Sequence, residues 1–196
     1  MSGKIRPQTP LERLHRLCLV ALMGALIASG ALVHVAIGPI PVTFQDAFVT
    51  LSGLVLGPVH SLYAVGLYVL AGIAGFPVFS GGKAGLGHVF GPTGGYIAGF
   101  FLLAFWAGVG RRAAERFLNM GKAMTVAQFV VIVVCVLIGR FFGYALGLLW
   151  LMHSLDLSFS EAFAVGVVPF LIPGPVKMFC VILFWKYLRL YAPQCP

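Results

Sequence analysis

Residues 75–100 read GFPVFSGGKAGLGHVFGPTGGYIAGF, and this stretch decides how the chain folds. Its glycines and prolines disfavour continuous helix or strand, yet it carries almost no charge and lies between long apolar runs. Irregular backbone within a membrane domain must face protein or a water-filled cavity, because lipid cannot satisfy its polar groups. The stretch therefore predicts a structured loop and is the first place to look for a binding site.

The whole chain is far more apolar than a soluble protein. Of its 196 residues, 60% are hydrophobic and 9% are charged, and its mean hydropathy is +1.01. Soluble domains have about a quarter of their residues charged, and each helical crossing of a membrane needs roughly 20 apolar residues. We therefore expect an all-α integral membrane protein, a single membrane domain over residues 1–196 with six transmembrane helices.

The net charge of +8 comes from basic residues that are grouped between the apolar runs. The three groups are Lys4, Arg6, Arg13 and Arg16; Arg111, Arg112, Arg116 and Lys122; and Lys186 and Arg189. Such grouping is typical of loops on the cytoplasmic side of a membrane. It predicts a multi-pass protein of the cytoplasmic (inner) membrane with both termini in the cytoplasm. We therefore expect the protein to contact the lipid bilayer and not nucleic acid.

The apolar runs predict where the spans lie. We expect them at about residues 14–37, 43–57, 59–75, 93–109, 126–152 and 162–185. Proline removes a backbone donor and restricts the residue before it, so the helices should break at 38–42 and at Gly57–Pro58. Thr93 can cap the fourth span.

Small residues recur along the first span at four-residue spacing. Ala21, Ala25 and Ser29 would share one helix face, where small side chains allow another helix to approach closely. This face either packs within the chain or docks another subunit.

The second span begins with polar residues. Thr43 and Gln45 either hydrogen-bond a polar ligand or cap the helix at the membrane interface, and capping is the favoured interpretation for Asp46.

Three basic residues lie outside the charged groups. An ionisable side chain within a span costs roughly 3 kcal/mol on insertion scales and needs a partner or a cavity. Lys177 follows the break at 172–175 and has no acidic residue in the adjoining turns, so we expect it to bind a ligand anion; the alternative is extension to the interface. Arg140 is interpreted as structural rather than ligand-facing, and Lys83 contacts either a ligand anion or solvent. Lys83 and Lys177 together predict a carboxylate-bearing ligand.

The sequence offers little for catalysis or metal binding. It contains no HExxH pair, no GxSxG turn and no paired carboxylates within the spans, and its four cysteines have no metal-like spacing. We therefore expect neither an enzyme nor a bound metal or cofactor.

Four motifs make the chain resemble a known family along nearly its whole length. They are PIPVTFQ at 39–45, GLVLGP at 53–58, FPVFSGG at 76–82 and GPTGGY at 91–96. The chain resembles the BioY family, the biotin-specific substrate-binding (S) components of energy-coupling-factor (ECF) transporters.

The resemblance implies that the chain captures biotin from outside the cell. A separate module, with a transmembrane coupling subunit and two ATPase subunits, would drive its release inside. In such families an AxxxA pattern on the first helix docks the coupling subunit, and Ala21 and Ala25 match that pattern.

The resemblance also implies a binding role for the outer loops and the sixth helix, where the family has an acidic residue followed by a lysine. Lys177 falls at the lysine position, but Gly174 stands where the acid is expected. Thr43, Gln45 or Asp156 would then have to meet the ureido N–H groups of biotin.

The residue types suit biotin, which has a polar ureido ring, an apolar thiophane ring and alkyl chain, and a carboxylate. Aromatic walls could come from Phe79, Tyr96 and Trp150, and a cation from Lys177 or Lys83, in either orientation of the ligand. The expected ligand-binding residues are Thr43, Gln45, Phe79, Lys83, Thr93, Tyr96, Trp150, Asp156 and Lys177. The alternatives are an S component for another small carboxylate-bearing vitamin and an intramembrane enzyme.

Overall fold

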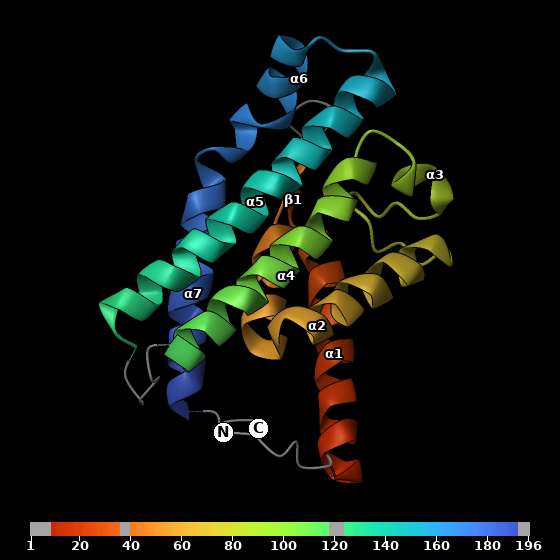
Figure 1. Ribbon diagram of the computed structural model, residues 1–196. Helices are drawn as coiled ribbons and strands as arrows, with labels where there is room; N and C mark the ends of the chain where they lie inside the picture. The colour runs from red at the N-terminus through yellow and green to blue at the C-terminus, as the bar shows by residue number, and fades with distance from the viewer. Residues whose placement is uncertain (1–8, 36–39, 118–123, 192–196) are drawn as a thin grey trace.

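A computed structural model describes residues 9–35, 40–117 and 124–191, and most of them are helical (Figure 1). The helices are α1 (Pro10–Gly30), α2 (Gln45–Ile73), α3 (Leu86–Val89), α4 (Gly94–Phe117), α5 (Val126–Leu155), α6 (Phe159–Gly166) and α7 (Pro173–Tyr191), with a 3₁₀ turn η1 (Val168–Phe170). The strands β1 (His34–Val35) and β2 (Val42–Thr43) pair antiparallel, His34 opposite Thr43. The expected helical class is confirmed, with this short hairpin as an addition.

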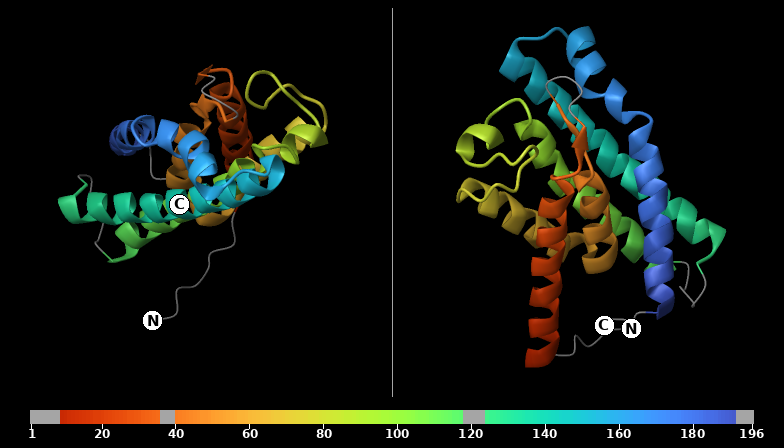
Figure 2. Two further views of the ribbon diagram at one scale, coloured as in Figure 1. Left: turned by 90° about the horizontal axis from the view of Figure 1, so that it is seen from above. Right: turned by 180° about the vertical axis from the view of Figure 1, so that it is seen from behind.

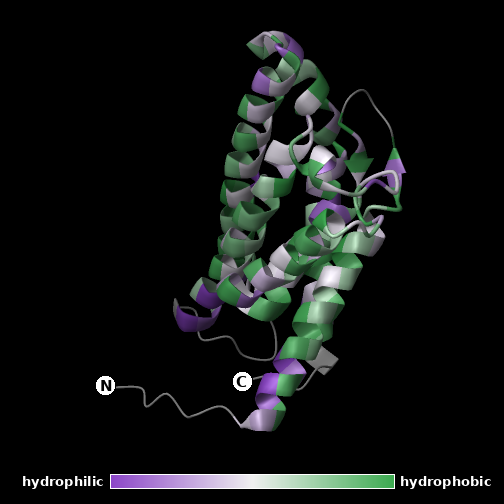
Figure 3. Cartoon of the chain, turned by 90° about the vertical axis from the view of Figure 1, so that its right-hand side faces the viewer, coloured by the Kyte–Doolittle hydropathy of each residue, from purple (hydrophilic) through white to green (hydrophobic). Residues whose placement is uncertain are grey.

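Four helical segments among the described residues are long and apolar enough to cross a membrane. They are Gln45–Ile73, Gly94–Arg116, Val126–Leu155 and Phe159–Arg189. Hydrophobic residues fill the long middle parts of the helices and hydrophilic ones gather at their ends (Figure 3). The chain is thus a mostly helical membrane protein.

Helix α2 is broken where the sequence predicts a turn. Gly57 has φ 77° and ψ 179°, a backbone conformation that only glycine adopts without strain. Pro58 follows it and has no N–H to offer the carbonyl of Leu54. Arg111 of α4 compensates, because its Nη1 donates to the carbonyls of Leu54, at 3.2 Å, and of Val55.

Helices α4 and α5 approach each other closely at a pair of glycines. A Cβ atom on Gly99 would lie 2.9 Å from the Cα of Gly143, so position 99 has no room for a side chain, and a Cβ atom on Gly143 would lie 3.2 Å from the carbonyl oxygen of Gly99. Close backbone contact of this kind is a common way for membrane helices to pack. The two helices run side by side through the molecule, and α4 also packs against α2 (Figures 1 and 2).

The remaining helices complete the bundle around α2. Seen from behind, α1 and α7 flank the broken helix (Figure 2, right), and both pack against it. The start of α1 and the end of α7 lie at one end of the molecule, whereas the β1–β2 hairpin, the α3 region and α6 lie toward the other (Figure 1).

The break expected at 172–175 lies slightly earlier in the structure. Helix α6 ends at Gly166, η1 follows, and Pro173 is the first residue of α7. Proline suits the first turn of a helix because the N–H that it lacks would have no intrahelical partner there. The break therefore lies before Pro173, and Lys177 sits in the second turn of α7.

Candidate ligand-binding cavity

A cavity lies between the start of α2, the loop that follows α2, and helices α4 and α5. It measures about 80 Å³, several times what one water molecule needs. Ile40, Ile97, Phe100, Leu103 and Phe170 are among its apolar lining residues. Its polar lining residues include Thr43, Gln45, Asp46, Tyr68, Ser80, His88, Thr93, Tyr96, Arg140 and Tyr144.

One end of the cavity holds a charged cluster that is centred on Asp46. Its Oδ2 accepts a hydrogen bond from Arg140 Nη1 at 3.0 Å, and its Oδ1 accepts one from Lys177 Nζ at 2.5 Å. Lys177 also donates to the backbone carbonyl of Thr43 at 2.8 Å, and Arg140 Nη1 to the hydroxyl of Tyr144 at 3.0 Å. The first turn of α2 is thereby tied to the middle of α5 and the start of α7.

Because this cluster is buried, the loss of any one of its charges would destabilise the fold. The side chains of Arg140 and Lys177 are 7% and 8% exposed, and that of Asp46 is 15% exposed. Removing one partner of a buried ion pair commonly costs about 3–5 kcal/mol, because a charge is left uncompensated. The cluster joins two cations to one anion, so it carries one excess positive charge.

Two further donors of the cluster are buried without a partner. Among the described residues, nothing accepts a hydrogen bond from Nε or Nη2 of Arg140. Gly174 lies against the same guanidinium, since a Cβ there would be 2.9 Å from Nη1. A side chain at position 174 would therefore collide with Arg140 in its present place.

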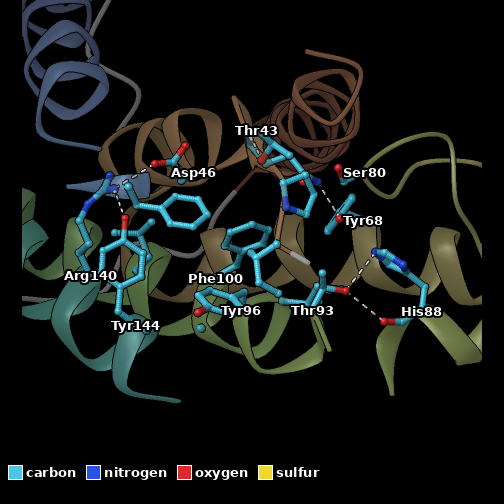
Figure 4. A pocket seen from close by; sticks show the side chains of 18 residues that line it. Thr43, Asp46, Tyr68, Ser80, His88, Thr93, Tyr96, Phe100, Arg140 and Tyr144 are labelled. Carbon is cyan, nitrogen blue, oxygen red and sulfur yellow. Dashed lines mark hydrogen bonds and ion pairs between the residues drawn. The ribbon is translucent and has the colours of Figure 1, made fainter. Parts of the chain in front are cut away.

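The other end of the cavity is polar but mostly uncharged. Gln45 Nε2 donates to the hydroxyl of Tyr68 at 2.7 Å, and Thr93 lies 3.3 Å from both the ring and the carbonyl of His88. The Ser80 hydroxyl is buried and has no hydrogen-bond partner in the described part of the chain. Figure 4 shows the two ends apart, with Tyr96 and Phe100 between them.

Aromatic rings form the wall near the break between α6 and η1. Tyr96 stacks on Phe170 with 6.2 Å between ring centroids, and Tyr144 lies 5.8 Å from Phe170. The Tyr96 hydroxyl donates to the carbonyl of Gly166, at the end of α6, at 2.8 Å. This bond joins α4 to the broken segment across the cavity wall.

The loop after α2 is fixed to that helix by Phe79. This side chain is fully buried, 5.6 Å from the ring of Tyr68 and stacked 4.9 Å from that of His88. Burial, together with the positive charge of Lys83, holds the pKa of His88 below its usual 6.5. His88 is therefore neutral at pH 7 and can both donate and accept hydrogen bonds.

The structure brings only some of the predicted ligand-binding residues to the cavity. Thr43, Gln45, Thr93 and Tyr96 line it. Lys177 lies behind Asp46, and Phe79 packs behind the lining. Lys83 is exposed on the loop, Trp150 donates to the Gly91 carbonyl at 2.8 Å, and Asp156 is exposed as the left-handed C-cap of α5. A ligand contact for each remains a prediction.

Two expectations from the sequence are wrong. Lys177 does have an acidic partner in the protein: Asp46 of α2, which precedes it by 131 residues in the sequence. Asp46 does not cap α2: the N-cap residue is Phe44, without a side-chain cap. Sequence reasoning also overlooked Tyr68, Ser80, His88 and Tyr144 as lining residues. Arg140, interpreted as structural, does pair with Asp46 and also lines the cavity. The one available signal was charge balance, since Arg140 and Lys177 within spans call for a nearby acid.

Comparisons with known proteins agree with the resemblance seen in the motifs. The sequence model of the BioY family matches residues 4–194. A protein from Pyrococcus horikoshii named "Probable biotin transporter BioY" is 37% identical over 87% of this chain and 94% of its own length. "Biotin transporter BioY" from Thermotoga maritima is 38% identical over 80% of this chain and 85% of its own.

A solved structure has the same fold. It is described as the "Crystal structure at 2.1 A of the S-component for biotin from an ECF-type ABC transporter". The TM-score is 0.81 at 24% identity, with 95% of this chain and 96% of that chain covered. At that identity the likeness concerns the fold alone.

Proposed function

The chain belongs to the BioY family, and on that premise we propose that it captures biotin from outside the cell as the substrate-binding component of an ECF-type transporter. The matching curated relatives are named biotin transporters, so the chain is a transport protein and not an enzyme. The observation that carries the proposal is the cavity. It combines apolar and aromatic walls with polar groups at two separated ends.

These features fit the chemistry of biotin. The thiophane ring and alkyl chain suit the wall of Tyr96, Phe100 and Phe170, and the two polar ends suit the ureido ring and the carboxylate. The excess positive charge of the Asp46 cluster favours a ligand with one negative charge. Thr43, Gln45, Thr93 and Tyr96 are the predicted binding residues that this arrangement supports best.

We place the protein in the cytoplasmic membrane with six crossings and both termini inside. Six crossings require that α1 crosses in addition to the four long apolar segments. They also require that the two halves of α2, before and after the break at Gly57, cross separately. The start of α1 and the end of α7 lie at one end of the molecule, which agrees with an even number of crossings (Figure 1). The cavity, near the other end, would then open to the outside.

The proposed partners are a transmembrane coupling subunit and two ATPase subunits. Ala21 and Ala25 are exposed on α1, opposite a buried face that includes Val20, Met23 and Ile27. An exposed row of small residues allows a second helix to come close, which supports docking at this face over packing within the chain.

Binding of labelled biotin to the purified chain tests the proposal. We expect saturable binding without ATP, and competition by unlabelled biotin but not by lipoate or pantothenate, which are carboxylates without a ureido ring. Size-exclusion chromatography shows whether the sample is folded. A monodisperse chain that fails to bind biotin would contradict the proposal.

A further inference from the structure

The charged cluster presents its anion to the cavity more openly than its cations. Asp46 and Arg140 both line the cavity, and Lys177 is not among the lining residues. The Asp46 side chain is about twice as exposed as either cation, at 15% against 7% and 8%. A ligand group at this end therefore meets the carboxylate first.

The cations already use several of their donors within the protein, and Lys177 does not line the cavity. Lys177 Nζ is engaged by Asp46 and by the Thr43 carbonyl, and Arg140 Nη1 by Asp46 and Tyr144. Nε and Nη2 of Arg140 are covered by protein, so a ligand in the cavity could reach them only if the guanidinium moved. Each oxygen of Asp46, in contrast, accepts one of these bonds and keeps further acceptor capacity.

This arrangement separates two electrostatic effects. The excess charge of the cluster lowers the cost of an anionic ligand anywhere in the cavity, because Coulomb interactions act over several ångströms at low dielectric. Direct contact depends on hydrogen-bond polarity, and a carboxylate acceptor needs an N–H or O–H donor opposite it. A ligand carboxylate placed against Asp46 would meet an acceptor of the same charge.

We propose that Asp46 is a specificity-determining residue whose carboxylate accepts a hydrogen bond from a ureido N–H of biotin. Arg140 and Lys177 are positioning residues that hold this carboxylate in place. The ligand carboxylate then lies at the opposite end of the cavity, where the Ser80 hydroxyl is a buried donor without a partner. This inference rests on the proposed function and assigns the ligand's orientation within it.

The test combines variants of Asp46 and Ser80 with two ligands, biotin and biotin methyl ester, which lacks the carboxylate charge. Asp46→Asn should weaken the binding of biotin methyl ester about 10- to 100-fold. It should weaken biotin less, because the cluster then carries two excess positive charges, which favour the anion. Asp46→Asn combined with Arg140→Gln restores the net charge of the cluster, so it should weaken both ligands by the same factor and should not restore affinity. Ser80→Ala should weaken biotin more than the ester, because a carboxylate accepts a stronger hydrogen bond than an ester carbonyl.

Several outcomes would overturn the proposal. If the ligand carboxylate contacts the cluster, Asp46→Asn will strengthen biotin binding, or the charge-matched double variant will change the ratio between the affinities for biotin and ester. Equal effects of Ser80→Ala on both ligands would contradict the assigned orientation too. That variant should fold normally, because removing an unpartnered buried hydroxyl does not break a hydrogen bond, so the test stands even if Asp46→Asn does not fold.

The same measurements distinguish failure of this inference from failure of the proposed function. A wild-type chain that does not bind biotin refutes the function itself. A wild-type chain that binds biotin, with Asp46→Asn binding equally well, refutes only the role of Asp46.

Discussion

At the scale of single residues, the Tyr96 hydroxyl links α4 to the carbonyl at which α6 ends. Tyr96→Phe keeps the ring stacked on Phe170 but leaves that carbonyl without its donor. We expect the free energy of unfolding to fall by about 1 kcal/mol and biotin affinity to fall severalfold. Thermal unfolding and binding of the purified variant measure both effects.

Tyr63→Phe is the matched control for this change, because Tyr63 is 61% exposed on α2 and is not among the residues lining the cavity. Equal stability and affinity in the two variants would mean that the bond to Gly166 contributes nothing.

His88 should make the fold sensitive to acid. Its pKa lies below 6.5 in the folded chain, through burial and the nearby charge of Lys83, so the unfolded chain binds a proton more readily. Stability is therefore fully present above about pH 6.5 and is lost as the pH falls below that value. The unfolding temperature of His88→Gln should fall less between pH 7.5 and pH 5.5 than that of the wild type. Parallel pH profiles would count against this role.

The sequence identifies several cavity residues and misses the centre of the charged cluster. Motifs predict that Thr43, Gln45, Thr93 and Tyr96 belong to one site, and the structure places all four at one cavity. Asp46 escapes prediction because capping is a local rule, whereas its partners lie 94 and 131 residues away. Which helices bring such residues together depends on tertiary packing.

At the scale of elements, the loop after α2 packs against a notch in that helix, which is formed by the missing side chain of Gly72. A Cβ atom on Gly72 would lie 2.1 Å from the ring of Phe79, so the ring needs a glycine there. Gly72→Val should expel Phe79, loosen the loop that carries Ser80 and His88, and lower biotin affinity at least tenfold. Limited proteolysis should cut the loop faster in this variant.

Gly66 provides the control on the same helix, since a Cβ atom there would meet nothing within 4 Å. Gly66→Val should retain affinity and resistance to proteolysis. If the two variants behave alike, the notch has no special role.

The breaks in the helices differ in how well the sequence predicts them. The break at Gly57–Pro58 is correctly located, because proline and a positive-φ glycine act locally. The break in the last span lies before Pro173, mostly ahead of the expected 172–175, because a proline can begin a helix as readily as end one. Local composition therefore indicates that a break exists but not on which side of the proline it falls.

At the scale of the whole molecule, the exposed face of α1 should matter for transport but not for capture. Replacing Ala21 and Ala25 together with leucine leaves the buried face of α1 untouched, so binding of biotin by the isolated chain should stay within about twofold of the wild type, since exposed substitutions rarely change stability much. Uptake into cells that contain the complete transporter should fall strongly, because the added side chains would hold the proposed coupling subunit away.

Val130→Leu with Val134→Leu is the matched control, at the same spacing on an exposed face of α5. Uptake should be normal in this variant. Loss of binding in the α1 variant would instead indicate ordinary packing within the chain.

The ion cluster around Asp46 also bears on how the chain is made. Asp46 is synthesised 94 residues before Arg140 and 131 residues before Lys177. During synthesis its carboxylate therefore enters the membrane region well before either counter-charge exists. Arg140 supplies one counter-charge once α5 has been made, and Lys177 adds the second only when α7 follows. A chain that stops short of α7 therefore keeps a neutral Asp46–Arg140 pair and lacks the excess positive charge of the complete cluster.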